Sequence, residues 1–317
     1  MKKALITGVA GFAGSHLAEY LIPQKIKVFG TFHPNHSVEN VEHLKSQLQL
    51  IAVNLLKRQD VEGAVSTVSF DYIFHLAAFS SPAKSFENPT NTLKNNILSQ
   101  INLLESLAKI GSKAKILIVG SADEYGDIDP KYLPATEKTP LAPISPYAVS
   151  KVVQDMLGHQ YFLHHRLKLV RVRPFNHIGP RQSISFVVPA FASKIAALER
   201  QGGGIIKVGN LDSWRDFTDV RDVVRAYLLA LEKCSFGDVY NIGSGKPVEI
   251  RDILGKLISL SKVKIKVIQD KKLLSPVEIK KIYCDSSKFQ KQTGWFPKID
   301  LLKSLSDTIE YERRKLT

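Results

Sequence analysis

The sequence predicts an α/β fold in which helices cover both faces of a parallel sheet. Up to about residue 174, short apolar runs of strand type alternate regularly with helical segments. A glycine-rich turn, Gly8 to Gly14, directly follows the first of these runs. After Pro174 the alternation gives way to loops and mixed segments. Regular alternation is typical of a doubly wound, Rossmann-type sheet, and the later change indicates a smaller mixed α/β lobe.

The elements of the first half follow from their apolar patterns. Apolar runs of about five residues are typical of buried parallel strands, whereas apolar residues three and four apart indicate helices. We therefore expect strands at 3–7, 27–31, 48–53, 72–76, 115–120 and 169–173, and helices at 14–21, between 53 and 68, at 99–110 and at 146–165.

The second half is less regular. We expect helices at 186–200, 220–232 and 301 to about 314, and strands at 205–208 and 239–242. The helix at 220–232 and the strand at 239–242 should return to the main sheet. We therefore predict a first domain at 1–174 plus about 218–245, and a second lobe at about 175–217 and 246–317.

The composition excludes several classes of protein. The chain has 317 residues, of which 44% are apolar and 23% charged, as in globular proteins. No apolar run approaches the roughly 20 residues that span a membrane. Two cysteines, Cys234 and Cys284, cannot make a disulfide framework or a metal site, and we expect a cytoplasmic protein without metal.

The net charge of +14 admits several anionic partners. The lysines near the C-terminus are scattered and lack interleaved aromatic residues, which single-stranded nucleic acid would require. We therefore favour a solvated basic face and expect neither nucleic acid nor a membrane as partner. A steep salt dependence of nucleic-acid binding would reverse that choice.

The glycine turn predicts a dinucleotide site in the first domain. Glycines at 8, 11 and 14 permit a tight turn and close approach of the backbone to a pyrophosphate, and the following helix offers free N–H groups. An NAD site usually has a carboxylate after the second strand, but the segment 30–36 has none. His33 or His36 could instead contact a 2′-phosphate. The sequence favours NADP(H), or a site that accepts NAD(H) as well.

A tyrosine and a lysine four residues apart, Tyr147 and Lys151, should share one face of the helix at 146–165. A nearby cation favours a phenolate, so we expect Lys151 to lower the pKa of Tyr147 and make it useful in acid–base chemistry. Ser121, just after an apolar strand, could orient a substrate carbonyl or hydroxyl. Together with the glycine turn, this set predicts catalysis; a redox sensor that binds dinucleotide without turnover would not need all three groups.

These motifs resemble those of the extended short-chain dehydrogenase/reductase family over essentially the whole chain. Members bind NAD(P) on the first domain and a nucleoside-diphosphate sugar on the second lobe. The segments at 175–182 and 206–211 look like the branch that handles GDP-mannose derivatives, on its 4-keto-6-deoxymannose reductase side. The further matching motifs are GVAGFAG at 8–14, HLAA at 75–78, YG at 125–126, SPYAVSK at 145–151, RPFN at 173–176, RDFTDVRD at 215–222, YNIGSG at 240–245 and TGW at 293–295.

The resemblance implies the following site residues. Ser121, Tyr147 and Lys151 would be catalytic. The cofactor-binding residues would be Gly8, Gly11, Phe12, Ala13, Gly14, His33, Asn54, Leu55, Leu76, Ala77, Ala78, Tyr147 and Lys151. The residues that bind the substrate would be Ser121, Ala122, Asn176, Arg181, Lys194, Arg215 and Glu278, of which Lys194 and Arg181 equally suit a solvated surface.

Two departures from the family pattern bear on the reaction. Related dehydratases have a glutamate base two positions before the Tyr-Gly pair, where this chain has Asp123. Glu124 is adjacent, but on an extended segment it would point to the opposite side. The usual arginine before Glu278 is replaced by Ser275, with Lys271 or Lys272 as candidate substitutes.

The expected activity is therefore NADPH-dependent reduction of the 4-keto group of a nucleoside-diphosphate 4-keto-6-deoxy sugar, with a GDP sugar favoured. A GDP-mannose 4,6-dehydratase or a nucleotide-sugar epimerase with tightly bound NAD(P) is the alternative. The resemblance also implies a homodimer packed through the helices at 99–110 and 146–165.

Overall fold

The fold is organised around one parallel sheet. A computed structural model describes residues 1–274 and 279–316. Seven strands of this described chain form the sheet in the order β10-β6-β5-β4-β1-β2-β3, and each neighbouring pair is parallel. This arrangement confirms the predicted fold class. The strands are β1 (Lys3–Thr7), β2 (Lys27–Phe32), β3 (Leu48–Ala52), β4 (Tyr72–His75), β5 (Lys115–Val119), β6 (Lys168–Pro174) and β10 (Val239–Ile242).

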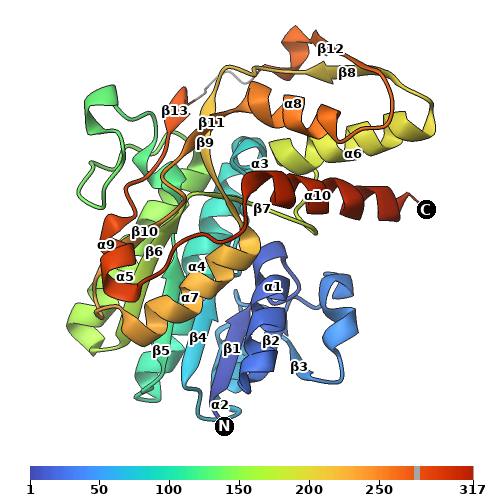
Figure 1. Cartoon of the computed structure of the whole chain (residues 1–317). Coiled ribbons are helices and arrows are strands. Elements are labelled where there is room, and N and C mark those ends of the chain that lie inside the picture. The colour runs from blue at the N-terminus through green and yellow to red at the C-terminus, as the bar shows by residue number, and fades with distance from the viewer. Residues whose placement is uncertain (275–278, 317) are drawn as a thin grey trace.

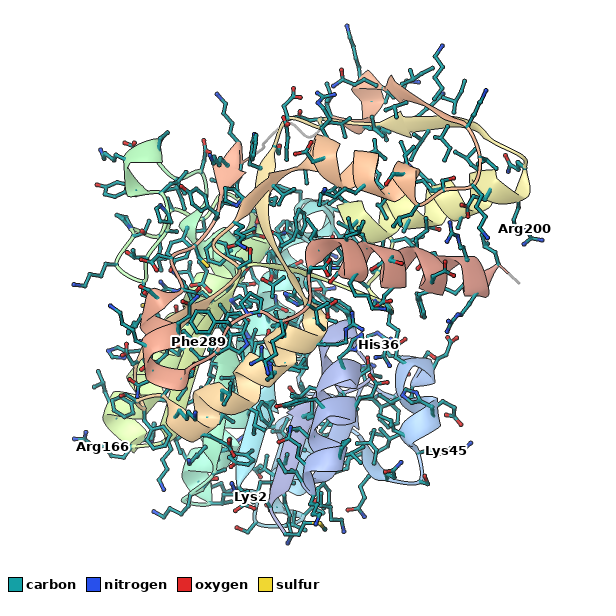
Figure 2. All side chains as sticks on the ribbon, in the orientation of Figure 1. Lys2, His36, Lys45, Arg166, Arg200 and Phe289 are labelled. Carbon is teal, nitrogen blue, oxygen red and sulfur yellow. The ribbon has the colours of Figure 1, made fainter. Side chains whose placement is uncertain are left out.

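Helices cover both faces of the sheet (Figure 1). Two separate apolar clusters, one on each face, bury their inward side chains. One face carries α1 (Phe12–Leu21), α7 (Val220–Lys233) and α9 (Ser287–Thr293), and the other carries α2 (Arg58–Ser66), α4 (Pro89–Lys109) and α5 (Pro146–His165). In the first cluster, Phe289 of α9, which Figure 2 labels, meets Trp295 edge to face. The ring centroids are 5.7 Å apart.

A second group of elements lies at the end of the molecule opposite the N-terminus (Figure 1). It has its own apolar cluster, which includes Phe191, Ile253 and Ile309. The helices are α6 (Val187–Arg200), α8 (Ile250–Ser259) and α10 (Leu301–Lys315), and the parallel strands β8 (Gly204–Val208) and β12 (Ile265–Gln269) pair beside them.

Short strands lie between these two groups of elements. Strand β9 (Trp214–Asp219) is central: β7 and β13 pair with it in parallel and β11 antiparallel. These strands carry several residues expected to face the substrate. The partners are β7 (Asn176–Ile178), β11 (Pro247–Glu249) and β13 (Lys281–Ile282).

Short helices connect the longer elements along the described chain. They are α3 (Pro82–Glu87), η1 (Ile22–Gln24), η2 (Glu39–Leu44), η3 (Ala122–Tyr125), η4 (Pro130–Tyr132) and η5 (Lys271–Leu273).

Most predicted elements are present, with two informative differences. The strands expected at 3–7 and 239–242 and the helix at 146–165 have the predicted bounds. Helix α4 begins at Pro89, ten residues before the predicted start. Its first turns are rich in asparagine, which hid the apolar pattern, and Asn88 caps them by accepting a hydrogen bond from the Asn91 N–H. Helix α8 was not predicted, although Ile250, Ile253, Leu254 and Leu257 form its buried stripe.

Helix α7 and strand β10 do return to the main sheet, since β10 pairs with β6 at its edge. The division into two domains at the stated boundaries stays a prediction. None of the described helices is both long enough and apolar enough to cross a membrane.

Candidate active site

The glycine turn lies between β1 and α1, where the backbone needs glycine. Gly8 has a φ of +71°, and a Cβ there would lie 2.9 Å from the Cα of Ala77. A Cβ on Gly14 would overlap the carbonyl oxygen of Gly8. Gly11 is the N-cap of α1 and offers no side-chain cap, so the first N–H groups of that helix, including those of Phe12 and Ala13, are available to an anion.

A cavity of about 420 Å³ opens beside this turn. None of its described lining residues is acidic. His33 and His36 both line it, with ring centroids 5.0 Å apart. The glycine cradle, a helix N-terminus and the absence of a carboxylate fit a dinucleotide with a 2′-phosphate. Among the residues predicted to bind cofactor, the cavity is lined by Gly8, Gly11, His33, Asn54, Leu55, Leu76, Ala77 and Ala78.

A buried contact missed from the sequence shapes this cavity. The hydroxyl of Thr7 accepts hydrogen bonds from the N–H groups of Leu76 and Ala77, both at 3.2 Å, and lies 2.9 Å from Nδ1 of His75. Burial, with the charge of Lys151 adding to it, lowers the pKa of His75 to about 3, so the ring is neutral. Thr7 therefore fixes the backbone after β4 against β1. No local pattern reveals this pairing, because the partners are 68 to 70 residues apart.

Tyr147 and Lys151 lie on one face of α5, as expected. Ser145 caps the helix by accepting from the Ala148 N–H at 3.1 Å. The Lys151 ammonium lies 6.0 Å from the centroid of the Tyr147 ring and donates to the carbonyl oxygen of Val119 at 2.8 Å. The side chains are 8% and 5% exposed. The carbonyl at the end of β5 thus holds the lysine beneath the tyrosine.

Ser121 joins this pair from a different element. It is the N-cap of η3, and its side chain lies near enough to Tyr147 to act on the pKa of that phenol. Its hydroxyl also accepts from the Asp123 N–H at 3.1 Å, and Glu124 accepts from its N–H at 2.8 Å. The expectation that 121–126 is extended is wrong, because this capping box winds the segment into a 3₁₀ turn. The structure nevertheless brings together all three residues predicted as catalytic.

The ionisation of Tyr147 differs from the prediction. Burial raises the pKa of Tyr147 well above its ordinary value, and the negative charges of Asp123 and Glu124 add to this, whereas the side chain of Ser121 opposes it. The predicted lowering by Lys151 is therefore wrong for this structure. Burial also lowers the pKa of Lys151 to about 8, against the opposing charge of Glu124.

Some residues expected to bind the substrate lie beside this group. Ala122, buried, follows Ser121 in η3. Burial raises the pKa of Asp123, and the charge of Arg215 on β9 opposes the rise, so Arg215 is near enough to act on this carboxyl group. Asn176 is exposed on β7, which pairs with β9.

Of three other predicted residues, Arg181 and Lys194 lie elsewhere, and Glu278 is not among the described residues. The guanidinium of Arg181 binds Glu19 of α1, with a closest contact of 2.6 Å, and its other partners are on α1 and η2. This position braces the loop before α6 against α1, so its binding of substrate stays a prediction. Lys194 is exposed on α6 and donates to the carbonyl oxygen of Lys207 at 3.1 Å. Glu278 and the segment from 275 lie outside the described residues.

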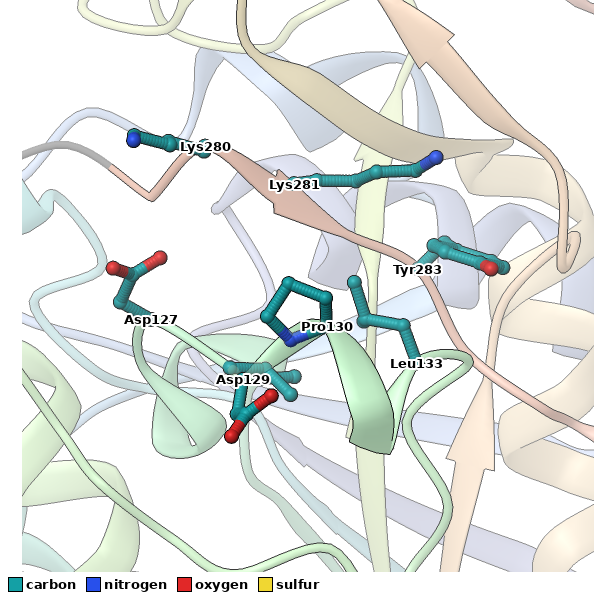
Figure 3. A pocket seen from close by; sticks show the side chains of 8 residues that line it. Asp127, Asp129, Pro130, Leu133, Lys280, Lys281 and Tyr283 are labelled. Atoms are coloured by element: carbon teal, nitrogen blue, oxygen red, sulfur yellow. The ribbon is translucent and has the colours of Figure 1, made fainter.

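A second cavity, of about 490 Å³, lies between the loop around η4 and β13 (Figure 3). Asp127 and Asp129 line one side, and Lys280 and Lys281 the other. None of the described residues predicted to bind cofactor or substrate lines it. Nor does the described part of the chain gather three or more His, Cys, Asp or Glu side chains that could hold a metal ion.

Comparison with known proteins adds three relatives. The family model described as GDP-mannose 4,6 dehydratase matches residues 5–308. GDP-6-deoxy-D-mannose reductase of Pseudomonas aeruginosa is 32% identical over 96% of this chain and 95% of its own. The structure of RMD from Pseudomonas aeruginosa complexed with NADPH is 29% identical, with a TM-score of 0.85 over 99% of this chain and 100% of that one. The Thermus thermophilus UDP-glucose 4-epimerase complex with NAD is 26% identical, with a TM-score of 0.85 over 98% and 99%.

Proposed function

The chain belongs to the GDP-mannose 4,6-dehydratase family, a branch of the extended short-chain dehydrogenases/reductases, and we propose that it is a ketoreductase within that family. Its substrate would be a nucleoside-diphosphate 4-keto-6-deoxy sugar, with GDP-4-keto-6-deoxymannose favoured and a GDP-deoxysugar such as GDP-rhamnose as product. The similarity to a GDP-6-deoxy-D-mannose reductase along almost the whole of both chains supports this choice.

The proposed cofactor is NADPH, with NADH as a second substrate for the same cavity. Bound cofactor would supply a hydride to the sugar C4 carbonyl. Gly8, the N-terminus of α1 and the backbone of Ala77 would hold it, and His33 would contact the 2′-phosphate. The absence of a carboxylate among the described lining residues supports NADPH, as does the NADPH bound to RMD of Pseudomonas aeruginosa.

The three catalytic side chains would each have one task. Tyr147 would donate its phenolic proton to the oxygen that becomes negative as the ketone is reduced. Ser121 would hold that oxygen by a hydrogen bond, and Lys151 would place its positive charge below the tyrosine. A raised pKa suits this direction of reaction, because Tyr147 then carries the proton that it must give up.

One observation carries the choice of reductase over dehydratase. A dehydratase must also remove a proton from C5 of the sugar, which requires a carboxylate base. Glu124 is fully buried and bound to the N–H of Ser121, so it is not available. Asp123 is one methylene shorter than the glutamate of the related dehydratases, and the positive charge of Arg215 acts on it. Ketone reduction needs no such base.

The direct test is cofactor oxidation by the purified protein. We expect oxidation of NADPH, faster than of NADH, with GDP-4-keto-6-deoxymannose and none with GDP-mannose. Tyr147→Phe should lower kcat by about 10² to 10⁴, the usual contribution of general acid–base catalysis, with nearly unchanged NADPH affinity. Conversion of GDP-mannose to a keto product without net oxidation would instead identify a dehydratase, and unchanged turnover in Tyr147→Phe would refute the role of the tyrosine.

Asp123→Asn distinguishes the two reactions within one protein. In a reductase the substitution removes a negative charge near Tyr147 and should change kcat by less than about tenfold. In a dehydratase it removes the base and should cost about 10² or more. Both rates are measured on the same preparation, with the keto sugar and with GDP-mannose, and a loss above 10² in ketone reduction would contradict the proposal.

A further inference from the structure

The candidate catalytic groups stand on two separate elements. Ser121 caps η3 after β5, whereas Tyr147 and Lys151 belong to α5. Reacting groups must be held within a fraction of an ångström of their working positions, and a displacement of about 1 Å can cost about 10² in rate. Something must therefore fix η3 relative to α5.

On η3, the residue that holds Ser121 in place is Glu124. Its side chain is fully buried, and Oε1 accepts from the Ser121 N–H at 2.8 Å. The carboxylate fills the space above Gly120, where a Cβ would overlap Oε1. The position of Glu124 therefore determines the position of Ser121.

On α5, the residue that holds the helix against the sheet is Asp155, one helical turn after Lys151. It is 1% exposed and binds two guanidinium groups of β6. One of its oxygens pairs with Arg171 and the other accepts from Nε of Arg173 at 2.7 Å. Asp155 thus ties the helix that carries Tyr147 and Lys151 to the sheet.

Arg173 contacts both sides. It is 3% exposed, and its Nε lies 3.1 Å from Oε2 of Glu124 while the Nε proton points to Asp155. The contact with Glu124 is therefore a close approach of the two groups without a directed hydrogen bond. The guanidinium also donates to the Tyr125 hydroxyl at 3.1 Å and lies 5.2 Å from the centroid of that ring.

Two carboxyl groups and two guanidinium groups meet in this cluster, which has little contact with solvent, and burial together with the charge of Asp155 raises the pKa of Glu124 to about 8. Such buried pairs often stabilise a fold no better than apolar side chains of equal volume, although removing one partner is strongly destabilising. Stability alone therefore does not explain the cluster. The geometry of the cluster offers an explanation, because η3 and α5 are both attached to one rigid, planar side chain, that of Arg173.

We propose that Glu124, Arg173 and Asp155 are positioning residues that set Ser121 relative to Tyr147 and Lys151. The proposal rests on the catalytic role proposed above for Ser121. Glu124 acts on the reaction through Ser121, whose N–H it binds. Its removal should therefore matter only while the serine hydroxyl is present.

A double-mutant cycle tests this prediction. Glu124→Ala should lower kcat by about 10- to 100-fold with little change in the KM for NADPH. In the Ser121→Ala background the same substitution should change kcat by less than about threefold. Glu124→Gln keeps an oxygen acceptor for the Ser121 N–H and should recover part of the lost rate. It also serves for the cycle if Glu124→Ala does not fold.

The matched control is Asp219→Ala, which removes another fully buried carboxylate. Asp219 caps α7 through the Arg221 N–H at 2.8 Å and pairs with the Arg221 guanidinium, so its loss should destabilise the protein similarly. We expect nearly unchanged kcat in this variant. An equal fall in kcat in both variants, or a Glu124→Ala effect of equal size with and without Ser121, would overturn the proposal.

A second measurement needs no substrate. Amide hydrogen exchange of the peptide that contains Ser121 should become faster in Glu124→Ala and stay unchanged in Asp219→Ala. Unchanged exchange in both variants would refute the contact between Glu124 and Ser121. A wild-type protein without turnover on the keto sugar would count against the proposed function, whereas an active protein with an additive cycle would count against the positioning role alone.

Discussion

Tyr147 and Lys151 are both almost completely buried, and burial acts on their ionisation in opposite directions. It raises the pKa of the phenol and lowers that of the ammonium, since in each case it disfavours the charged form. The tyrosine therefore holds its proton over the physiological range. At the scale of single residues, burial is the largest cause of both pKa shifts, and Lys151 does not lower the pKa of Tyr147.

The lysine makes a testable prediction about pH. Its pKa is about 8 in the folded, cofactor-free protein against an ordinary value of 10.5, so between these values the unfolded chain binds more protons. The free energy of unfolding should therefore rise with pH through this window, by about 3 kcal/mol from Lys151. We expect the rise to be smaller by that amount in Lys151→Met, as measured by urea unfolding at several pH values.

Lys291, exposed on α9, provides the control for this experiment. Lys291→Met should keep the pH slope of the wild-type protein. Equal slopes in wild type and Lys151→Met would show that burial of Lys151 has no such effect.

At the scale of the element, the turn between β1 and α1 is where local sequence and tertiary packing agree most closely. Position 8 requires glycine for two reasons: its φ is left-handed, and an added Cβ would lie too close to Ala77, which follows β4. The turn therefore couples the cofactor cavity to two strands of the sheet.

Two glycines give a matched pair of substitutions. Gly8→Ala combines backbone strain with a contact of 2.9 Å to the Ala77 Cα, and should weaken NADPH binding at least about tenfold. Gly63, exposed in α2, has nothing within 4 Å of an added Cβ, so Gly63→Ala should raise the free energy of unfolding by about 0.5–1 kcal/mol and leave NADPH affinity unchanged. Fluorescence titration and urea unfolding measure the two effects, and equal NADPH affinities in the two variants would contradict the role of Gly8.

At the scale of the whole molecule, the outer side of α5 indicates how two copies would meet. Val149, Met156 and Leu163 follow one another at intervals of seven residues and are 39%, 44% and 52% exposed. Residues seven apart lie on one face of a helix, so these form an exposed apolar stripe. The stripe supports the part of the predicted homodimer interface that α5 would supply.

Met156→Lys places a charge in the middle of this stripe and should convert the predicted dimer to a monomer at micromolar concentration, as measured by light scattering. Leu302, 49% exposed on α10, is the matched control, and Leu302→Lys should leave the mass unchanged. A wild-type monomer, or a Met156→Lys variant of unchanged mass, would refute the packing through α5.

Features that depend on near neighbours can be predicted from the amino-acid order alone. The strand, glycine turn and helix at the start of the chain, and the placement of Tyr147 and Lys151 on one helical face, follow from spacings of a few residues because backbone geometry fixes which of them share a face. Pairings between distant residues become visible only in the folded chain. Glu124 meets Arg173, Thr7 meets His75, and Arg181 turns to Glu19, over separations of 49 to 162 residues. No local pattern encodes such contacts, because each depends on how the sheet and helices pack and on which charges that packing removes from water.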